Sequence, residues 1–222
     1  MSLAMMELQE IPALGGDPAV RVFEATDLEL LATITGRPVA ELVARWTGGH
    51  RAYIATSEGI PAAFGWVATR AATMGELGLT LRIGADERYL WNFVTLPAFR
   101  GRGIYPRLLQ DIIATEASRG SERFWIAYAP ENHASAAGIR KAGFSHVAEL
   151  SFGAEGKAAV RLLAPELGAR VAALLGVPET TGSLTPCWKC VRAGRGTMYC
   201  ADGECACDYQ RPAVECSEHV AS

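Results

Sequence analysis

One short stretch, residues 96–109 (LPAFRGRGIYPRLL), restricts the fold of this chain more than any other part of the sequence. It sets Arg100, Gly101, Arg102 and Gly103 between a strand-like segment and a segment whose apolar residues recur at helical spacing. The first backbone N–H groups of a helix have no partner within the helix, and they carry the positive end of its dipole. Glycine lets a ligand approach the backbone closely, and arginine pairs with phosphate oxygens. The stretch therefore predicts a strand, a turn and a helix that together bind an anion of the pyrophosphate type.

The spacing of this turn excludes two other phosphate-binding loops. A Walker A loop would continue with Gly-Lys-Ser or Gly-Lys-Thr, and neither follows Gly103. The dinucleotide-binding pattern would need a third glycine where Pro106 stands. A solvated basic turn that begins a helix remains the alternative to an anion site.

Composition places the chain among globular proteins with one main domain. Half of its 222 residues are hydrophobic and 20% are charged. No apolar run approaches the roughly 18 residues that cross a bilayer, and residues 1–18 lack the pattern of a secretory signal. We therefore expect a cytoplasmic protein with no membrane partner. The net charge of -3 argues against a nucleic-acid partner, which would require a broad basic face.

Hydrophobic patterning predicts strands and helices throughout the part of the chain that precedes the first cysteine. The expected strands cover residues 20–24, 51–56, 62–69, 79–83, 89–96, 123–129, 145–152 and 158–163. The expected helices cover residues 103–118, 134–142 and 167–175, together with two helices within residues 28–43. Asp27 is expected to cap the first helix, and Gly36-Arg37-Pro38 to separate it from the second.

Two motifs at this spacing resemble those of the GNAT N-acetyltransferase superfamily. VTLPAFRGRGIYPRLL is similar to its acyl-CoA pyrophosphate loop, Arg/Gln-x-x-Gly-x-Gly/Ala, through Arg100, Gly103 and Tyr105. ENHASAAGIRKAGF is similar to the family stretch Asn-x-x-Ala-x-x-x-Tyr-x-x-x-Gly-Phe through Asn132, Gly143 and Phe144. The resemblance implies an α/β (α+β) fold, with a mixed, mainly antiparallel twisted sheet flanked by helices.

The resemblance covers residues 19–164 and implies an acyl-CoA-dependent N-acyltransferase. Acetyl-CoA would be the donor, and the amine of a small molecule or a peptide would attack its thioester directly. The strand that ends at Thr95 would splay from its neighbour, and Asn132 would hold the pantetheine arm or frame the thioester. The implied coenzyme A-binding residues are Phe93, Val94, Thr95, Arg100, Gly101, Arg102, Gly103, Ile104, Tyr105 and Asn132.

The catalytic acid and base do not follow from the resemblance. Many members place a tyrosine acid where Ile139 stands, and often a glutamate base where Trp91 and Asn92 stand. Tyr128, late in a strand that should border the thioester, is one candidate acid, and a packed core tyrosine is the alternative. Asn92 is a second candidate, because its side chain could order a water that relays the amine proton.

Four further residues near the motifs have expected roles of lesser weight. Tyr105 stands where the loop pattern has a small residue, and Ser135 stands where alanine is usual. Glu87 is expected in a solvated turn, and His133 on the surface of a helix cap.

The acceptor side is expected within residues 27–51 and 69–88. Trp46 lies beside the pair Gly48 and Gly49, which suits either a flap over a pocket or a helix end with the tryptophan in the core. No residue there identifies the amine.

All six cysteines lie in a tail, which divides the chain into a body, residues 1–178, and an extension, residues 179–222. A short segment with few apolar residues needs a crosslink to fold, and Cys-x-x-Cys is a favoured spacing for zinc. The predicted zinc ligands are Cys187, Cys190, Cys205 and Cys207, with Cys200, Cys216 and His219 as alternatives. Three disulfides, an iron–sulfur cluster and a disordered tail that carries thiols remain open.

A second function of another class fits the same motifs. The chain would bind coenzyme A without turnover, as a regulatory protein whose tail binds a protein partner, and Ile139 in place of the acid favours this hypothesis. A homodimer is the other association considered. Release of thiol from the thioester would separate the enzyme from the binding protein.

Overall fold

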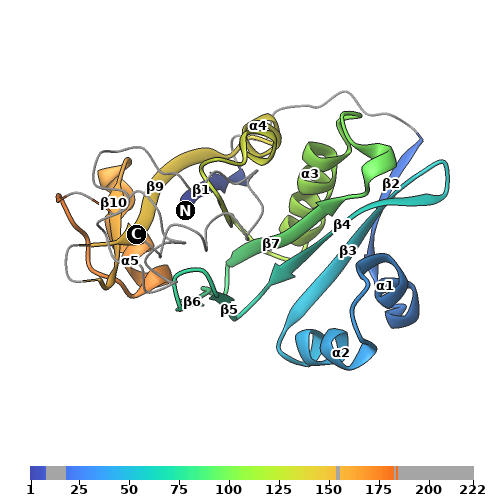
Figure 1. Ribbon diagram of the computed structural model, residues 1–222, viewed down its shortest axis with the longest axis horizontal. Coiled ribbons are helices and arrows are strands. Elements are labelled where there is room, and N and C mark those ends of the chain that lie inside the picture. The colour runs from blue at the N-terminus through green and yellow to red at the C-terminus, as the bar shows by residue number, and fades with distance from the viewer. Residues whose placement is uncertain (9–18, 154–155, 183, 185–222) are drawn as a thin grey trace, which may run out of the picture.

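The computed structural model describes residues 1–8, 19–153, 156–182 and 184, and an eight-stranded sheet runs through it (Figure 1). Its strand order is β10-β9-β1-β8-β7-β4-β3-β2. The strands are β1 (Ser2–Glu7), β2 (Val20–Ala25), β3 (His50–Ser57), β4 (Ile60–Ala68), β7 (Glu87–Thr95), β8 (Arg123–Tyr128), β9 (Ser145–Phe152) and β10 (Ala158–Leu162). Neighbouring strands are antiparallel except β7 and β8, which are parallel. The predicted mixed, mainly antiparallel sheet is confirmed.

Five α-helices cover the two faces of this sheet within the described residues. They are α1 (Leu28–Thr35), α2 (Val39–Thr47), α3 (Ile104–Ala117), α4 (His133–Lys141) and α5 (Gly168–Leu175). Successive side chains of a strand point to opposite faces, and on β3 Tyr53 packs in the cluster under α3 while Ile54 packs in the cluster under α1 and α2. Figure 1 shows α3 and α4 on one side of the sheet and α1 and α2 on the other. No helix among the described residues is long and apolar enough to span a membrane.

Local signals in the sequence explain how α1 and α2 begin and end. The Asp27 carboxylate accepts hydrogen bonds from the N–H groups of Glu29 and Leu30, both at 3.0 Å. Gly36, at φ +66°, ends α1 in the left-handed conformation, and α2 starts after Pro38. The expected cap and the expected break are both confirmed.

Strand β1 is a finding that the sequence did not predict. It lies between β8 and β9 and pairs antiparallel with both, and its residues Leu3, Ala4 and Met6 are almost wholly buried. Since both of its faces are covered, its residues lack the alternation of apolar and polar side chains that identifies a strand in a sequence. A short second sheet, β5 (Ala71–Met74) with β6 (Leu79–Arg82), was predicted only in its second strand.

Candidate active site

The parallel pair of strands opens into a gap at one end. β7 and β8 pair only as far as Leu90 with Ile126, so the rest of β7, up to Thr95, leaves its neighbour. On its other edge β7 stays paired with β4, with Phe64 opposite Val94. The strand expected to splay therefore does so, and backbone N–H and C=O groups of β7 face the gap instead of a partner strand.

A bulge in β7 lies at the start of this gap. Trp66 of β4 pairs with Trp91, and Phe64 pairs with Val94, so β7 has one residue more than β4 across this interval. Asn92 takes up the extra residue with φ +54°, in the left-handed region that asparagine tolerates better than most residues. The residues that follow the bulge, from Phe93 to Thr95, belong to the part of β7 that no longer pairs with β8.

A glycine on β4 makes room for the aromatic side chain that follows the bulge. A Cβ atom on Gly65 would lie 2.0 Å from Cε1 of Phe93, so the ring rests directly on the glycine backbone. Phe93 thereby packs against the core cluster under α3, and its backbone remains in the gap. Only glycine at position 65 permits this arrangement.

The glycine-rich turn joins the end of β7 to the start of α3. Gly101 and Gly103 have φ of +76° and +73°, and Gly103 precedes the helix with no side chain capping it. The N–H of Arg100 is used within the turn, where it donates to the carbonyl of Pro97 at 3.3 Å. The N–H groups of the next five residues are those that this helix start leaves for a ligand.

The arginine side chains of the turn have separate positions. Nε of Arg100 donates to the carbonyl of Thr95 at 3.2 Å, which ties the turn to the end of β7. The guanidinium of Arg102 lies over the ring of Phe99, 5.5 Å from its centre. The structure therefore brings the glycine-rich turn close to Thr95, the last residue of β7 that was predicted to bind coenzyme A. Arg102 is exposed on the turn.

The first turn of α4 contributes the other predicted binding residue. Oδ1 of Asn132 caps the helix by accepting from the N–H of Ser135 at 3.0 Å. This leaves the side-chain nitrogen of Asn132 as its group that can reach a ligand. About two helical turns after Asn132, Ile139 is 1% exposed and belongs to the core.

Tyr105, on the first turn of α3, spans the space between the two helices. Its hydroxyl lies 3.4 Å from Oγ of Ser135 on α4, and its ring lies 5.7 Å from the ring of Phe93. A Cβ on Gly138 would lie 2.4 Å from the tyrosine ring, so this ring also rests on a glycine. Burial raises the pKa of Tyr105 to about 12, and the hydrogen bond with Ser135 opposes that rise. Two departures from the family pattern, at positions 105 and 135, thus contact each other.

Residues 20–144 match the model of the Acetyltransferase (GNAT) family. The chain belongs to this family. No curated protein matches the chain in a sequence search. The assignment agrees with the opened strand pair and the glycine-rich helix start described above.

Solved structures with a similar fold include three acetyltransferases. A GCN5-related N-acetyltransferase from Kribbella flavida is 13% identical over 65% of this chain and 53% of its own, with a TM-score of 0.43. A GNAT-family acetyltransferase from Colwellia psychrerythraea is 18% identical over 65% of this chain and 52% of its own, with a TM-score of 0.46. The ribosomal-protein-S18-alanine N-acetyltransferase from Escherichia coli is 20% identical over 63% of this chain and 86% of its own, with a TM-score of 0.45. The chain spans about half the length of the first two structures.

In this member of the GNAT family the candidate catalytic residues lie on different elements around the gap between β7 and β8. Asn92 is in the bulge itself. Tyr128 ends β8 and packs half-buried against the core cluster under α3, with its ring 6.0 Å from that of His146 on β9. His133 is exposed at the start of α4, as expected. Glu87 is not a solvated turn residue: it begins β7, at the end far from the gap, and accepts from Arg123 at 2.8 Å.

The opposite face of β7 carries an aromatic and cationic cluster under α2. The guanidinium of Arg45 lies 5.0 Å from the ring centre of Trp66 and 4.7 Å from that of Trp91, and His50 stands edge-on to Trp91 at 5.1 Å. Burial, and then the charge of Arg45, lower the pKa of His50. Trp46 is 50% exposed, so the interpretation that puts it in the core is wrong.

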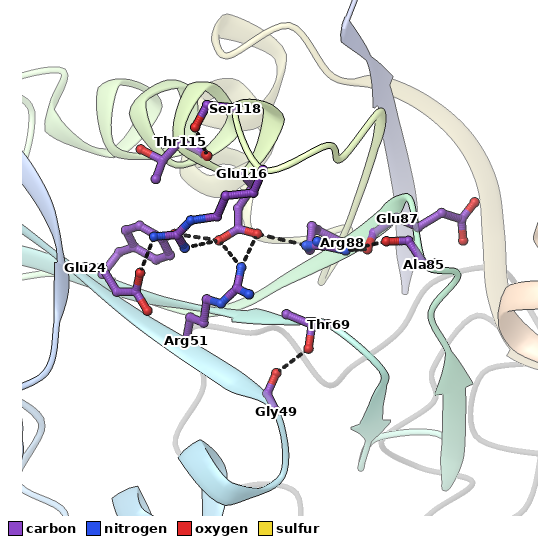
Figure 2. A network of polar contacts seen from close by, with 12 residues as sticks. Glu24, Gly49, Arg51, Thr69, Ala85, Glu87, Arg88, Thr115, Glu116 and Ser118 are labelled. Atoms are coloured by element: carbon purple, nitrogen blue, oxygen red, sulfur yellow. Dashed lines mark hydrogen bonds and ion pairs between the residues drawn. The ribbon is translucent and has the colours of Figure 1, made fainter.

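A buried carboxylate at the other end of α3 was missed by the sequence analysis. Glu116 is fully buried and accepts from Arg51 at 2.6 Å, Tyr53 at 2.6 Å and Arg88 at 2.8 Å. Figure 2 shows Arg51 and Arg88 pointing toward its carboxylate. Burial alone would raise its pKa, but the hydrogen bonds from Tyr53, Arg88 and Arg51 outweigh this and hold the pKa below the ordinary carboxyl value. The signal was present, because Glu116 continues the apolar stripe of Ile112 at helical spacing and so faces the core.

The described part of the chain contains no group of three His, Cys, Asp or Glu side chains placed to bind a metal ion. The predicted zinc ligands, Cys187, Cys190, Cys205 and Cys207 with their alternatives, lie outside the described residues.

Proposed function

We propose that the chain is an acetyl-CoA-dependent N-acetyltransferase whose acceptor is an amine of a small molecule or a peptide. The observation that carries this proposal is the separation of β7 from β8 beyond Leu90, next to an uncapped helix start with two glycines at positive φ. Membership of the GNAT family supports the same reaction.

The pyrophosphate of the donor would bind at the start of α3. The free N–H groups from Gly101 to Tyr105 would donate to its oxygens, and the helix dipole would favour its charge. Arg102 is exposed on the turn and would add an ion pair to a phosphate oxygen.

The thioester would lie in the gap beside the bulge. Backbone N–H groups of the segment from Phe93 to Thr95, which have left β8, would polarise the carbonyl, and Asn132 would hold the pantetheine arm. The amine would attack the carbonyl carbon to form the C–N bond, and the C–S bond would then break to release coenzyme A. What this chain supplies is chiefly the fixed position of the two reactants.

Calorimetric titration with acetyl-CoA tests the donor site. We expect saturable binding that Arg102→Ala weakens about 10- to 100-fold, because a charge-assisted hydrogen bond contributes about 1.5–3 kcal/mol. Gly103→Glu should abolish binding, since it places a carboxylate at the phosphate site and a side chain at φ +73°. Gly120→Glu is the matched control, because Gly120 also has positive φ, with open space around it, and lies at the other end of α3.

Release of coenzyme A thiol in the presence of a panel of amines then tests the reaction. Amine-dependent release establishes transfer and identifies the acceptor class. Saturable binding of acetyl-CoA with no release under any amine would show that the enzyme proposal is wrong.

One observation favours the second function, binding of coenzyme A without turnover. Ile139, at the position of the usual tyrosine acid, is buried in the core and has no proton to donate. A coenzyme A-binding protein without turnover would have this feature. Binding without thiol release is the outcome that this alternative predicts.

A further inference from the structure

The departure of coenzyme A leaves a charge that the residue at position 139 cannot stabilise. When the C–S bond breaks, the electron pair stays on sulfur, and the thiolate needs a hydrogen-bond donor or a cation close by. Ile139 supplies neither. A side-chain donor for the thiolate would have to come from another residue that borders the gap between β7 and β8.

Tyr105 is fixed beside that gap by contacts on both sides of its ring. On one side the ring rests on Gly138 of α4, where even a Cβ atom would lie 2.4 Å away. On another side lies the ring of Phe93, 5.7 Å away, and the backbone of Phe93 belongs to the segment of β7 that has left β8. The side chain of Tyr105 starts on the first turn of α3, where the pyrophosphate would bind, and its hydroxyl lies beside Ser135 on the first turn of α4.

The hydroxyl end of this side chain is held in place as well. It lies 3.4 Å from Oγ of Ser135, and the backbone N–H of Ser135 is itself bound to the side chain of Asn132. The hydroxyl thus lies at the same turn of α4 as the residue expected to hold the pantetheine arm. Serine at position 135 provides the partner that alanine could not.

We propose that the Tyr105 hydroxyl, positioned by Ser135, donates a hydrogen bond to the departing coenzyme A thiolate. This inference rests on the proposed function. In the step, the amine nitrogen forms the C–N bond, the C–S bond breaks with its electron pair on sulfur, and the proton of the attacking nitrogen passes to water. The tyrosine keeps its own proton throughout.

The acidity of the group fits donation of a hydrogen bond rather than of the proton. Burial raises the pKa of Tyr105 to about 12, whereas a thiol has a pKa of about 8.5. The proton therefore stays on the phenol while the thiolate forms. A hydrogen bond to a charged acceptor contributes about 1.5–3 kcal/mol, so it is strong enough to affect the rate of departure.

Tyr105→Phe tests the inference, because phenylalanine keeps the ring on Gly138 and removes only the hydroxyl. The rate is measured with the amine that gives the fastest thiol release, and the pKa of coenzyme A bound to the protein is measured from the absorbance of its thiolate. We expect kcat to fall about 10- to 100-fold, KM for acetyl-CoA to stay within about threefold, and the pKa of the bound thiol to rise by about one to two pH units. Ser135→Ala should shift both quantities in the same direction by a smaller factor, which tests the inference again should Tyr105→Phe fold poorly.

Two other tyrosines serve as comparisons. Tyr89→Phe is the matched control, since Tyr89 is buried in the cluster on the other face of the sheet. A Tyr105→Phe protein that behaves like Tyr89→Phe in both measurements overturns the inference while the acetyltransferase stands. The same effects in Tyr128→Phe alone overturn it too and assign the role to Tyr128. A wild-type chain that binds coenzyme A but transfers nothing overturns the proposed function first, and the inference with it.

Discussion

Replacing Glu116 by glutamine removes a buried negative charge that several donors share (Figure 2). Arg51, Tyr53 and Arg88 donate to the carboxylate at 2.6 to 2.8 Å. Removing one partner of a buried ion pair costs about 3–5 kcal/mol, because the other charge stays buried without compensation. The Arg51 side chain is 32% exposed and can turn to water, but that of Arg88 is 9% exposed and cannot. We therefore expect the lower end of that range, a loss of about 3 kcal/mol in the free energy of unfolding.

Urea unfolding at pH 7 measures this loss, and thermal unfolding should show Tm lowered by about 6–12 °C. Arg119→Ala is the control, because Arg119 is 37% exposed and its pairs with Glu24 and Glu116 lie at the surface end of the network. That variant should lose less than about 1 kcal/mol. A Glu116→Gln protein within 1 kcal/mol of the wild type would refute the reasoning, since Arg88 would then have to be solvated.

The pH dependence of the same pair of proteins tests the direction of the pKa shift. The pKa of Glu116 in the folded chain is held below the ordinary carboxyl value of 4.5, so the carboxylate stabilises the fold above that value. This stabilisation is lost as the pH falls through the lowered pKa. We expect the difference in unfolding free energy between wild type and Glu116→Gln to be full at pH 7 and to shrink below pH 4.5. A difference that grows on acidification would contradict the assignment.

Two further substitutions test packing. Leu3→Ala in β1 should cost about 2–5 kcal/mol in urea unfolding, because Leu3 is fully buried between β8 and β9; a cost below 0.5 kcal/mol would show that β1 is not part of the core. Gly65→Ala should displace the ring of Phe93 and lower the free energy of unfolding by about 1–3 kcal/mol. It should also weaken the binding of acetyl-CoA measured by calorimetry. Unchanged binding would show that the position of the Phe93 ring does not affect the site.

The local elements of this fold were predictable because their signals lie within a few residues of one another. The Asp27 cap, the break at Gly36 and the turn before α3 each depend on adjacent residues, and each forms as expected. Hydrophobic patterning predicted the other strands of the main sheet, including β3 and β4, whose two faces are both covered. It failed for β1, a six-residue segment without alternating polar side chains, and for β5, which has only four residues.

The parts of the site that were not predicted depend on residues far apart in the chain. Tyr105 and Ser135 looked like two unrelated departures until the helices α3 and α4 placed them 3.4 Å apart. Glu87 looked like a turn residue because its partner, Arg123, is supplied by the neighbouring strand. The sequence of each segment identifies these side chains, but it does not show which residue of another segment each side chain contacts.

The two ends of α3 have opposite roles, and this has a measurable consequence. The first turn has no side-chain cap and leaves its N–H groups for a ligand, while the last turn is fixed by the network around Glu116. Tyr105 and Glu116 lie about 16 Å apart along the helix and share no partner, so their effects should be additive. The variant with both Tyr105→Phe and Glu116→Gln should show the kcat of the first and the unfolding free energy of the second, measured well below its Tm. A tenfold loss of kcat in Glu116→Gln alone would instead show that the buried network positions the coenzyme A end of the helix.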